Sequence, residues 1–409
     1  MKRKLLPALI AAATLAGSTQ VLAGVPTVYG KINVSLNKYD LENLKFAGAG
    51  AGPNRNSGGL VGDELDNWSL ESNSSRIGVK GDFDLTDSLK AIYKLEFGVD
   101  ADNGTNSNGR EFNQRNIYAG LQSKTWGTIF AGKHDTPLKL IQTNTATQTD
   151  VDRFNDLPLA DLGSYLVGEN RADNVIQYAS PSFFGGLEVS IAAIQIEEDG
   201  VTAGQDDDGL VSGSSIGITY GGSSQWFAAL AYDNNVAATD TIRAVGELTL
   251  GAVKIGAIYQ TAEKHDKGDV IAPFSTFVGS NNAPNPISEW DGAGTVGGTP
   301  ASYSNVVSFK EQDGYVLNAA WKVAGPYTLK VQYGHSETTP QTIVNSTNPT
   351  GLQYGDVEVD SYALGLDYKF NDNARLYTYY ASLETDGDNR ISRGSTEDST
   401  FAVGLDLKF

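Results

Sequence analysis

The 409-residue sequence predicts an all-β protein whose antiparallel strands close into a membrane-spanning barrel. Three observations support this prediction: an amphipathic strand at the end of the chain, the same alternation repeated along its length, and connections that are alternately short and long. Apolar and polar side chains that alternate along a strand face opposite sides of a sheet, which suits a wall between lipid and a polar interior.

The last nine residues give the strongest single signal. One face of this predicted strand carries only apolar side chains, namely Phe401, Val403, Leu405, Leu407 and Phe409. A soluble protein gains little from ending an amphipathic strand on an exposed aromatic residue, because chain termini usually fray. In lipid, by contrast, a barrel has to pair its last strand with its first, since an open edge leaves backbone groups without partners. We therefore expect these five residues to form an assembly strand.

The same two-residue alternation recurs in segments of about ten residues, which is the length that a tilted strand needs to cross a bilayer. It is clearest at residues 28–36, 89–99, 187–193, 216–220, 253–259, 315–323, 327–333 and 362–370. Counting all candidates gives about 16 strands in a single domain. Two strands break the pattern, because Arg115 shares a face with Ile117 and Arg243 shares a face with Val245. The count is approximate for that reason.

The connections between these strands fall into two sets. Short ones lie near residues 84–88, 123–127, 183–186, 221–224, 251, 324–326 and 371–373. Long polar ones cover residues 40–66, 100–111, 134–170, 199–211, 263–311, 338–356 and 386–397. This asymmetry is typical of outer-membrane barrels, so we expect short periplasmic turns and long extracellular loops.

The first 23 residues have the pattern of a secretory signal peptide. Lys2, Arg3 and Lys4 precede an apolar core at residues 5–15, and Val21-Leu22-Ala23 supplies the small residues of a cleavage site. The apolar core is shorter than the roughly 20 residues of a membrane-spanning helix. We therefore expect a signal peptide at residues 1–23 and a barrel domain at residues 24–409.

The composition excludes several other classes of function. The chain has no Cys, which excludes disulfides, thiolate metal sites and Cys nucleophiles, and its formal charge of −19 argues against nucleic acid as a partner. His134, His265 and His335 fall in or beside predicted loops without metal-ligand spacing. We expect no metal, no cofactor and no catalytic residues. An outer-membrane protease or lipase would need a His or carboxylate constellation that these residues do not supply.

Several motifs resemble the general diffusion porins of Gram-negative (proteobacterial) outer membranes. They are the segments SRIGVKG at 75–81, RNIYAGL at 115–121 and RADNVIQY at 171–178, together with the terminal strand. The resemblance covers the chain from residue 24 onward. It implies a homotrimer of 16-stranded barrels, integral to the cell outer membrane, whose third long loop folds into the pore. It also implies contact with outer-membrane lipid, lipopolysaccharide and the assembly machinery of that membrane.

The constriction residues are predicted partly on physical grounds and partly from the resemblance. Arg76 and Lys80 alternate with apolar residues, and a basic side chain that faces lipid at the bilayer midplane costs about 2–4 kcal/mol, so both should point into the lumen. By resemblance, Arg115 and Arg171 complete this basic wall. The opposing acids should come from the third long loop, residues 134–170. They are Asp150, Asp152, Asp156 and Asp161, with Asp156-Leu157-Pro158 resembling the family's acidic loop tip.

Opposed charges across a narrow opening impose a transverse field on passing solutes, because screening at physiological salt acts over about 8 Å. The predicted function is therefore passive diffusion of ions and small hydrophilic solutes. Acids outnumber bases in the loop, so we expect a weak cation preference. The alternative is a substrate-selective channel, for example for oligosaccharides, which would need a track of inward-facing aromatic residues. The alternation places most aromatic residues on the lipid face instead.

Overall fold

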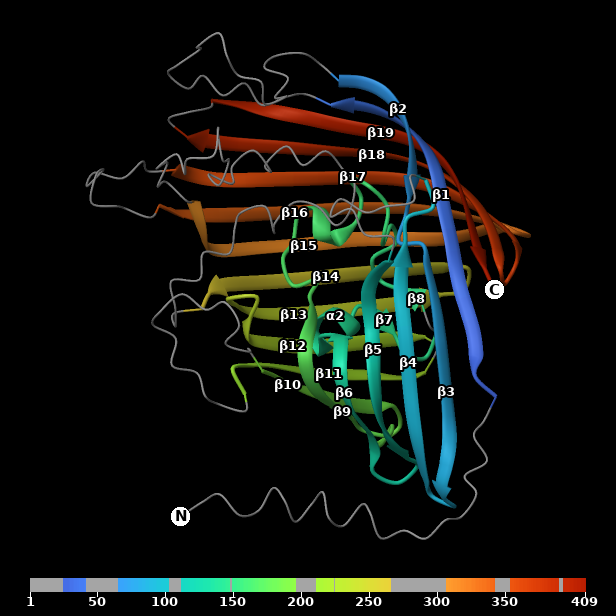
Figure 1. Ribbon diagram of the computed structural model, residues 1–409. Helices are drawn as coiled ribbons and strands as arrows, with labels where there is room; N and C mark the ends of the chain where they lie inside the picture. Colours follow the sequence, from blue (N-terminus) through green and yellow to red (C-terminus); the bar gives the residue numbers. More distant parts are fainter. Residues whose placement is uncertain are drawn as a thin grey trace, which may run out of the picture.

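The structure is a computed structural model. It describes residues 25–41, 65–102, 112–147, 149–195, 211–223, 225–265, 307–342, 354–389 and 393–409. These residues form a single closed antiparallel barrel (Figure 1). No helix among them is long and apolar enough to cross a membrane. Residues 1–24, where the signal peptide is predicted, lie outside the described residues, so the boundary after residue 23 remains a prediction.

The strands follow one another around the barrel in chain order. The first nine elements of the wall are β1 (Thr27–Leu41), β2 (Leu65–Ser72), β3 (Arg76–Thr86), β4 (Leu89–Val99), β5 (Phe112–Ser123), β6 (Gly127–Asp135), β9 (Arg171–Ala179), β10 (Leu187–Ile194) and β11 (Gly213–Ser223). The remaining ones are β12 (Trp226–Val236), β13 (Thr239–Leu250), β14 (Val253–Lys264), β15 (Val307–Ala324), β16 (Tyr327–Thr342), β17 (Tyr354–Asn371), β18 (Ala374–Asn389) and β19 (Arg393–Lys408).

The sheet contains 17 named strands, but two of them are halves of one. Both β2 and β3 pair with β1, and they are separated by a break at residues 73–75. Ser74 adopts a left-handed conformation there (φ 51°), and the Ser75 hydroxyl replaces the lost ladder bonds by donating to the Asn33 carbonyl and accepting from the Asn33 amide. Counted this way the barrel has 16 strands, which confirms the predicted fold class and strand number.

The barrel closes where β19 pairs with β1. The register places Lys31 opposite Lys408 and Leu36 opposite Val403. The last pair is Gly30 with Phe409, whose backbones exchange two hydrogen bonds of 2.9 and 3.1 Å. Gly30 is required by close approach, because a Cβ atom there would lie 2.3 Å from the Phe409 ring. The predicted assembly strand therefore forms one side of the closing seam.

The outer face is apolar and carries aromatic residues at two levels along the strands. Leu317, Leu364 and Val403 are about half exposed and face outward. Toward the short turns, the rings of Tyr327 and Tyr368 lie 5.0 Å apart, and further along the same two strands Tyr333 and Tyr362 lie 5.1 Å apart. Two aromatic girdles around an apolar band are the mark of a barrel that sits in a membrane.

The short connections agree with the prediction, but some of the long loops are shorter than predicted. The short turns are confirmed, and they gather at one end of the barrel, where the chain also ends (Figure 1). However, β16 runs to Thr342, β17 begins at Tyr354, β18 runs to Asn389 and β19 begins at Arg393. Parts of the predicted loops 338–356 and 386–397 are therefore strand. Beyond the lipid both faces of a strand can be polar, so the alternation disappears although the backbone pairing continues.

The two irregular strands have separate explanations. A bulge in β5 places Arg115 and Asn116 opposite the single residue Glu96, so Arg115 turns to the inner face while Ile117 faces outward. On β13, Arg243 and Val245 both point inward and are buried. Val245 is apolar because a loop covers the wall at that height, as described next.

Candidate pore constriction

The segment between β6 and β9, residues 136–170, folds into the barrel and lies against its inner wall. It contains the short helix α2 (Pro137–Leu140), the two-residue strands β7 (Thr143–Asn144) and β8 (Thr149–Asp150), and a 3₁₀ turn η1 (Leu162–Ser164). Its two ends meet where the Thr136 amide donates to the Asn170 carbonyl at 3.1 Å. We call this segment the inner loop; α2, β7 and β8 are visible within the barrel in Figure 1.

One side of the inner loop is apolar and fixes it to the wall. Its buried side chains are Leu138, Ile141, Val151, Phe154, Leu157, Leu159, Leu162, Tyr165 and Leu166, in one cluster with wall residues such as Val245, Ile258 and Val316. Burying a side chain of this size stabilises a fold by about 1.5–3 kcal/mol. The loop is thus held by its own hydrophobic core inside a pore whose remaining wall is polar.

Two wall glycines make room for the largest loop side chains. A Cβ atom at Gly334 on β16 would lie 2.3 Å from the Tyr165 ring, and one at Gly365 on β17 would lie 2.8 Å from the Phe154 ring. No side chain larger than hydrogen fits at these positions while the aromatic rings keep their places. The wall therefore carries sockets that fix the position of the inner loop.

Buried polar contacts add to this anchoring. Arg243 is fully buried and forms an ion pair of 2.6 Å with Glu169 at the end of the loop. Arg153, from the loop, pairs with Glu247 on β13 at 2.5 Å. Removing one partner of a buried ion pair is strongly destabilising because it leaves an uncompensated charge. Sequence reasoning missed the roles of all four residues, although the break in alternation at Arg243 was a signal for its own role.

The loop tip meets basic side chains of the wall. Lys31 on β1 forms an ion pair with Asp156 at 3.0 Å, and Arg76 on β3 lies 4.0 Å from the same carboxylate. Burial acts to raise the pKa of Asp156, but Lys31, Arg76 and Arg115 together hold it below its usual range. Asp156 thus stays charged and faces the predicted basic wall.

Beside this contact lies a second group on β4 and β5. Glu96 is buried and accepts from Arg115 at 3.1 Å, and Lys94 pairs with it at 3.1 Å. Lys80 forms no ion pair within the described part of the chain; its amino group lies 5.2 Å from the centre of the Tyr29 ring, and the Tyr29 hydroxyl donates to Glu96. Glu96 thus organises two bases of the wall.

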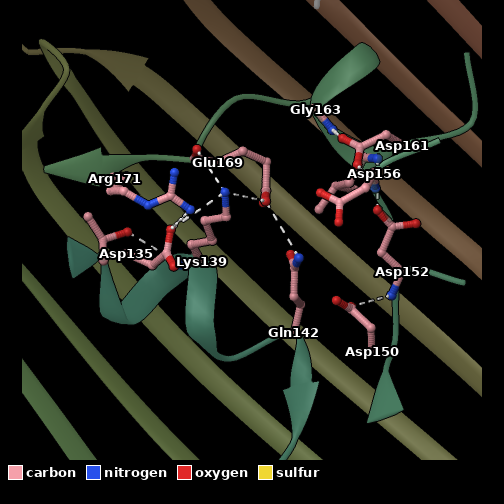
Figure 2. A network of polar contacts seen from close by, with 12 residues as sticks. Asp135, Lys139, Gln142, Asp150, Asp152, Asp156, Asp161, Gly163, Glu169 and Arg171 are labelled. Atoms are coloured by element: carbon pink, nitrogen blue, oxygen red, sulfur yellow. Dashed lines mark hydrogen bonds and ion pairs between the residues drawn. The ribbon is translucent and has the colours of Figure 1, made fainter. Parts of the chain in front are cut away.

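Arg171 lies at the base of the inner loop rather than at its tip. It pairs with Asp135 at 2.9 Å, and Lys139 of α2 lies 3.7 Å from both Asp135 and Glu169 (Figure 2). The predicted wall bases therefore come from three strands: Arg76 and Lys80 from β3, Arg115 from β5 and Arg171 from β9. We call the opening between this wall and the loop edge the eyelet.

The four predicted loop acids have different environments (Figure 2). Asp152 is buried, accepts from the Leu162 amide at 2.9 Å and from Gln332 at 2.8 Å, and burial raises its pKa to about 6. Asp161 caps η1 by accepting from the Gly163 amide, and Asp150 accepts from the Asp152 amide. Burial and neighbouring carboxylates raise the pKa of Asp150 and Asp161 well above the usual range.

Of these acids, Asp156 alone contacts wall bases among the described residues, whereas Asp152 and Asp161 shape the loop. Sequence reasoning also missed Lys31. Its alternation with Ile32 could have placed it inward, but its position at the eyelet depends on the pairing of β1 with β3, which sets it opposite Arg76.

A family comparison agrees with this architecture. The model of the family described as "Gram-negative porin" matches residues 7–388. The chain belongs to the Gram-negative porin family. This porin is therefore an integral outer-membrane protein that forms a channel for passive diffusion.

The sequence identity to individual relatives is low. Outer membrane porin F of Escherichia coli is 24% identical over the full length of both chains. An outer membrane porin protein of Bordetella pertussis is 30% identical, over 49% of this chain and 51% of that protein. Among solved structures, the anion-selective porin from Comamonas acidovorans has a TM-score of 0.59 at 17% identity and covers 94% of this chain and 99% of its own. The last likeness shows the fold alone.

Proposed function

We propose that this porin lets ions and small hydrophilic solutes diffuse through the eyelet, with a weak preference for cations. The observation that supports this proposal is the inner loop itself, which is anchored on one side of the lumen and presents Asp156 to Lys31 and Arg76. Opposed charges in a narrow opening with low-dielectric walls create a transverse field. Polar solutes align with such a field, and bulky apolar solutes are slowed.

The cation preference is proposed from the charge of the whole chain, −19, acting at the mouth on the side of the long acidic loops. Wall bases at the eyelet act in the opposite direction, so the net preference should be weak. At 0.1 M salt, screening limits the reach of these charges to about 10 Å. The cation preference should therefore fade as the salt concentration rises.

The alternative, an oligosaccharide-selective channel, finds little support. Inward aromatic residues exist, but Phe227, Tyr377 and Tyr379 are each only 2% exposed. The Tyr379 ring packs against Phe154 of the inner loop, and the Tyr377 hydroxyl donates to Asn33 of the wall. Tyr29 and Tyr118 are partly exposed and stand on different strands. A continuous sugar track would need several exposed rings in a row along the path.

The eyelet assignment predicts opposite effects of two charge substitutions. Asp156→Asn leaves Lys31 and Arg76 uncompensated and should lower the cation-to-anion permeability ratio about two-fold, whereas Arg76→Ser should raise it. The measurement is the zero-current potential across a planar bilayer in a KCl gradient. Asp173→Asn, which removes the same charge outside the eyelet, should keep the wild-type value. If Asp156→Asn and Arg76→Ser also keep it, these residues do not line the conducting path.

We also propose a homotrimer embedded in outer-membrane lipid and lipopolysaccharide, inserted by the membrane's assembly machinery. The support is family membership and a trimer form of OmpT from Vibrio cholerae, which matches with a TM-score of 0.54 at 16% identity. Unheated protein should migrate on a detergent gel as a high-mass species that becomes a monomer on boiling. A monomer under both conditions would contradict the trimer.

A further inference from the structure

A cavity of about 920 Å³ lies between the inner loop and the short-turn end of the barrel. Its lining includes Asp150 and Asp156 of the loop, and Gly251, Asn371 and Asn373 from the short turns. We call this cavity the inner vestibule. It shares Lys31, Arg76 and Asp156 with the eyelet and opens toward the short turns.

Six consecutive strands, β14 to β19, each contribute one basic side chain to the inner vestibule. These residues, called the basic stripe below, are Lys254, Lys322, Lys330, Lys369, Arg375 and Lys408. The sheet register brings like charges directly opposite one another: Lys369 faces Arg375, and Lys31 faces both Lys408 and Arg76. Such cross-strand pairs of like charge are destabilising, which favours a counter-anion between them.

Protein carboxylates neutralise only part of the basic stripe. Lys330 pairs with Asp367 at 3.2 Å, and Arg375 pairs with Asp367 at 3.0 Å and with Asp406 at 3.1 Å. Lys254 pairs with Glu247 at 3.2 Å. Among the described residues, Lys322 and Lys408 form no ion pair, and both are exposed to the vestibule.

The vestibule lining as a whole has nine basic residues and five acidic ones. One of these acids, Asp372, forms an ion pair with Lys369; it is exposed and lies in the short turn between β17 and β18. The net charge of the vestibule lining is therefore positive, whereas the formal charge of the whole chain is −19. A concave surface of one sign with low-dielectric walls concentrates counter-ions.

We propose that the inner vestibule is a binding site for small multivalent oxyanions, held by the basic stripe on the short-turn side of the eyelet. The inference rests on the proposed function, because the anion has to reach the vestibule through water in the pore. A dianion can contact two amino groups at once, whereas chloride neutralises one. The cavity is large enough for such an anion to keep part of its hydration shell.

The test is block of the potassium chloride current by inorganic phosphate in alkaline buffer, where phosphate is a dianion. Wild-type protein in planar bilayers at low salt should lose conductance as phosphate is added, to a saturating level. In the triple variant Lys322→Gln/Lys369→Gln/Lys408→Gln, three of the positive charges that attract the phosphate dianion are lost. The phosphate concentration for half-block should therefore rise about five-fold or more. All three side chains are exposed, so the barrel should tolerate the substitutions.

The matched control is Lys124→Gln/Lys133→Gln/Lys310→Gln, which removes the same charge from residues that do not line the cavity. It should keep the wild-type half-block concentration. Equal block of the two triple variants, or a wild-type channel that phosphate does not affect, would overturn the vestibule site while leaving the channel function intact. A wild-type protein without conductance in KCl would overturn the proposed function itself. If Lys408→Gln hinders assembly at the seam, the double variant Lys322→Gln/Lys369→Gln gives the same comparison.

Discussion

Deleting Phe409 is expected to lower the amount of assembled outer-membrane protein about ten-fold or more, because an unclosed barrel exposes backbone groups to lipid. Phe409 supplies the last pair of the seam, with two backbone hydrogen bonds to Gly30. Its ring also packs over Gly30, where no larger residue would fit. The measurement is the heat-modifiable fraction in isolated outer membranes, compared with the amount in the periplasm.

Two substitutions separate the contributions of the ring and the backbone. Phe409→Tyr keeps both and should assemble normally, whereas Phe409→Ala keeps the backbone hydrogen bonds and should give an intermediate level. Gly30→Val should fail in the same way as the deletion, since its side chain would occupy the place of the ring. Normal outer-membrane levels of the truncated protein would show that the seam closes without its final pair.

The second large effect is expected from Gly334→Val. Valine suits a strand by propensity, but its Cβ atom would overlap the ring of Tyr165, which is 2% exposed and fixed in the loop core. Overpacking of this kind typically costs about 1–3 kcal/mol, and here the inner loop is the part that can yield. We expect the loop to move away from the wall, with altered single-channel conductance and altered uptake rates of sugars of graded size.

Gly246 on β13, three strands away in the wall, offers a control. A Cβ atom at Gly246 would have only the Phe227 carbonyl oxygen near it, at 3.9 Å, so Gly246→Val should conduct like the wild type. Combining Gly334→Val with Tyr165→Ala removes the overlap and should restore part of the wild-type conductance. If Gly334→Val alone conducts like the wild type, Tyr165 does not hold the loop in place.

Most of the barrel could be predicted from sequence because its elements obey a period of two. The strand that ends at Phe409 and the turns near Gly251 and Asn371 follow directly from alternation and turn residues. The break at Ser74 could not be located in this way. At Arg115 the alternation showed that the strand is irregular but did not identify the bulge that causes it. The extension of the strands beyond the membrane also leaves no hydrophobic signal.

The eyelet was harder to predict than the wall. Arg76 and Asp156 could be placed near each other through the family resemblance, and the structure brings them within 4.0 Å. Lys31 joins them because β1 pairs with β3, which places it directly opposite Arg76, and because the inner loop brings Asp156 to it. The apolar side of the inner loop has no regular period, so the burial of Phe154 and Tyr165 could not be derived from alternation.

The inner loop keeps its attachment and its charged edge on different sides of one segment. Phe154 and Tyr165 face the wall, whereas Asp156 faces the opening. A change of charge at the edge therefore leaves the attachment untouched. Adaptation to a habitat with different salts or solutes requires only point substitutions along that edge, so the permeability of this protein is free to evolve without redesign of its scaffold.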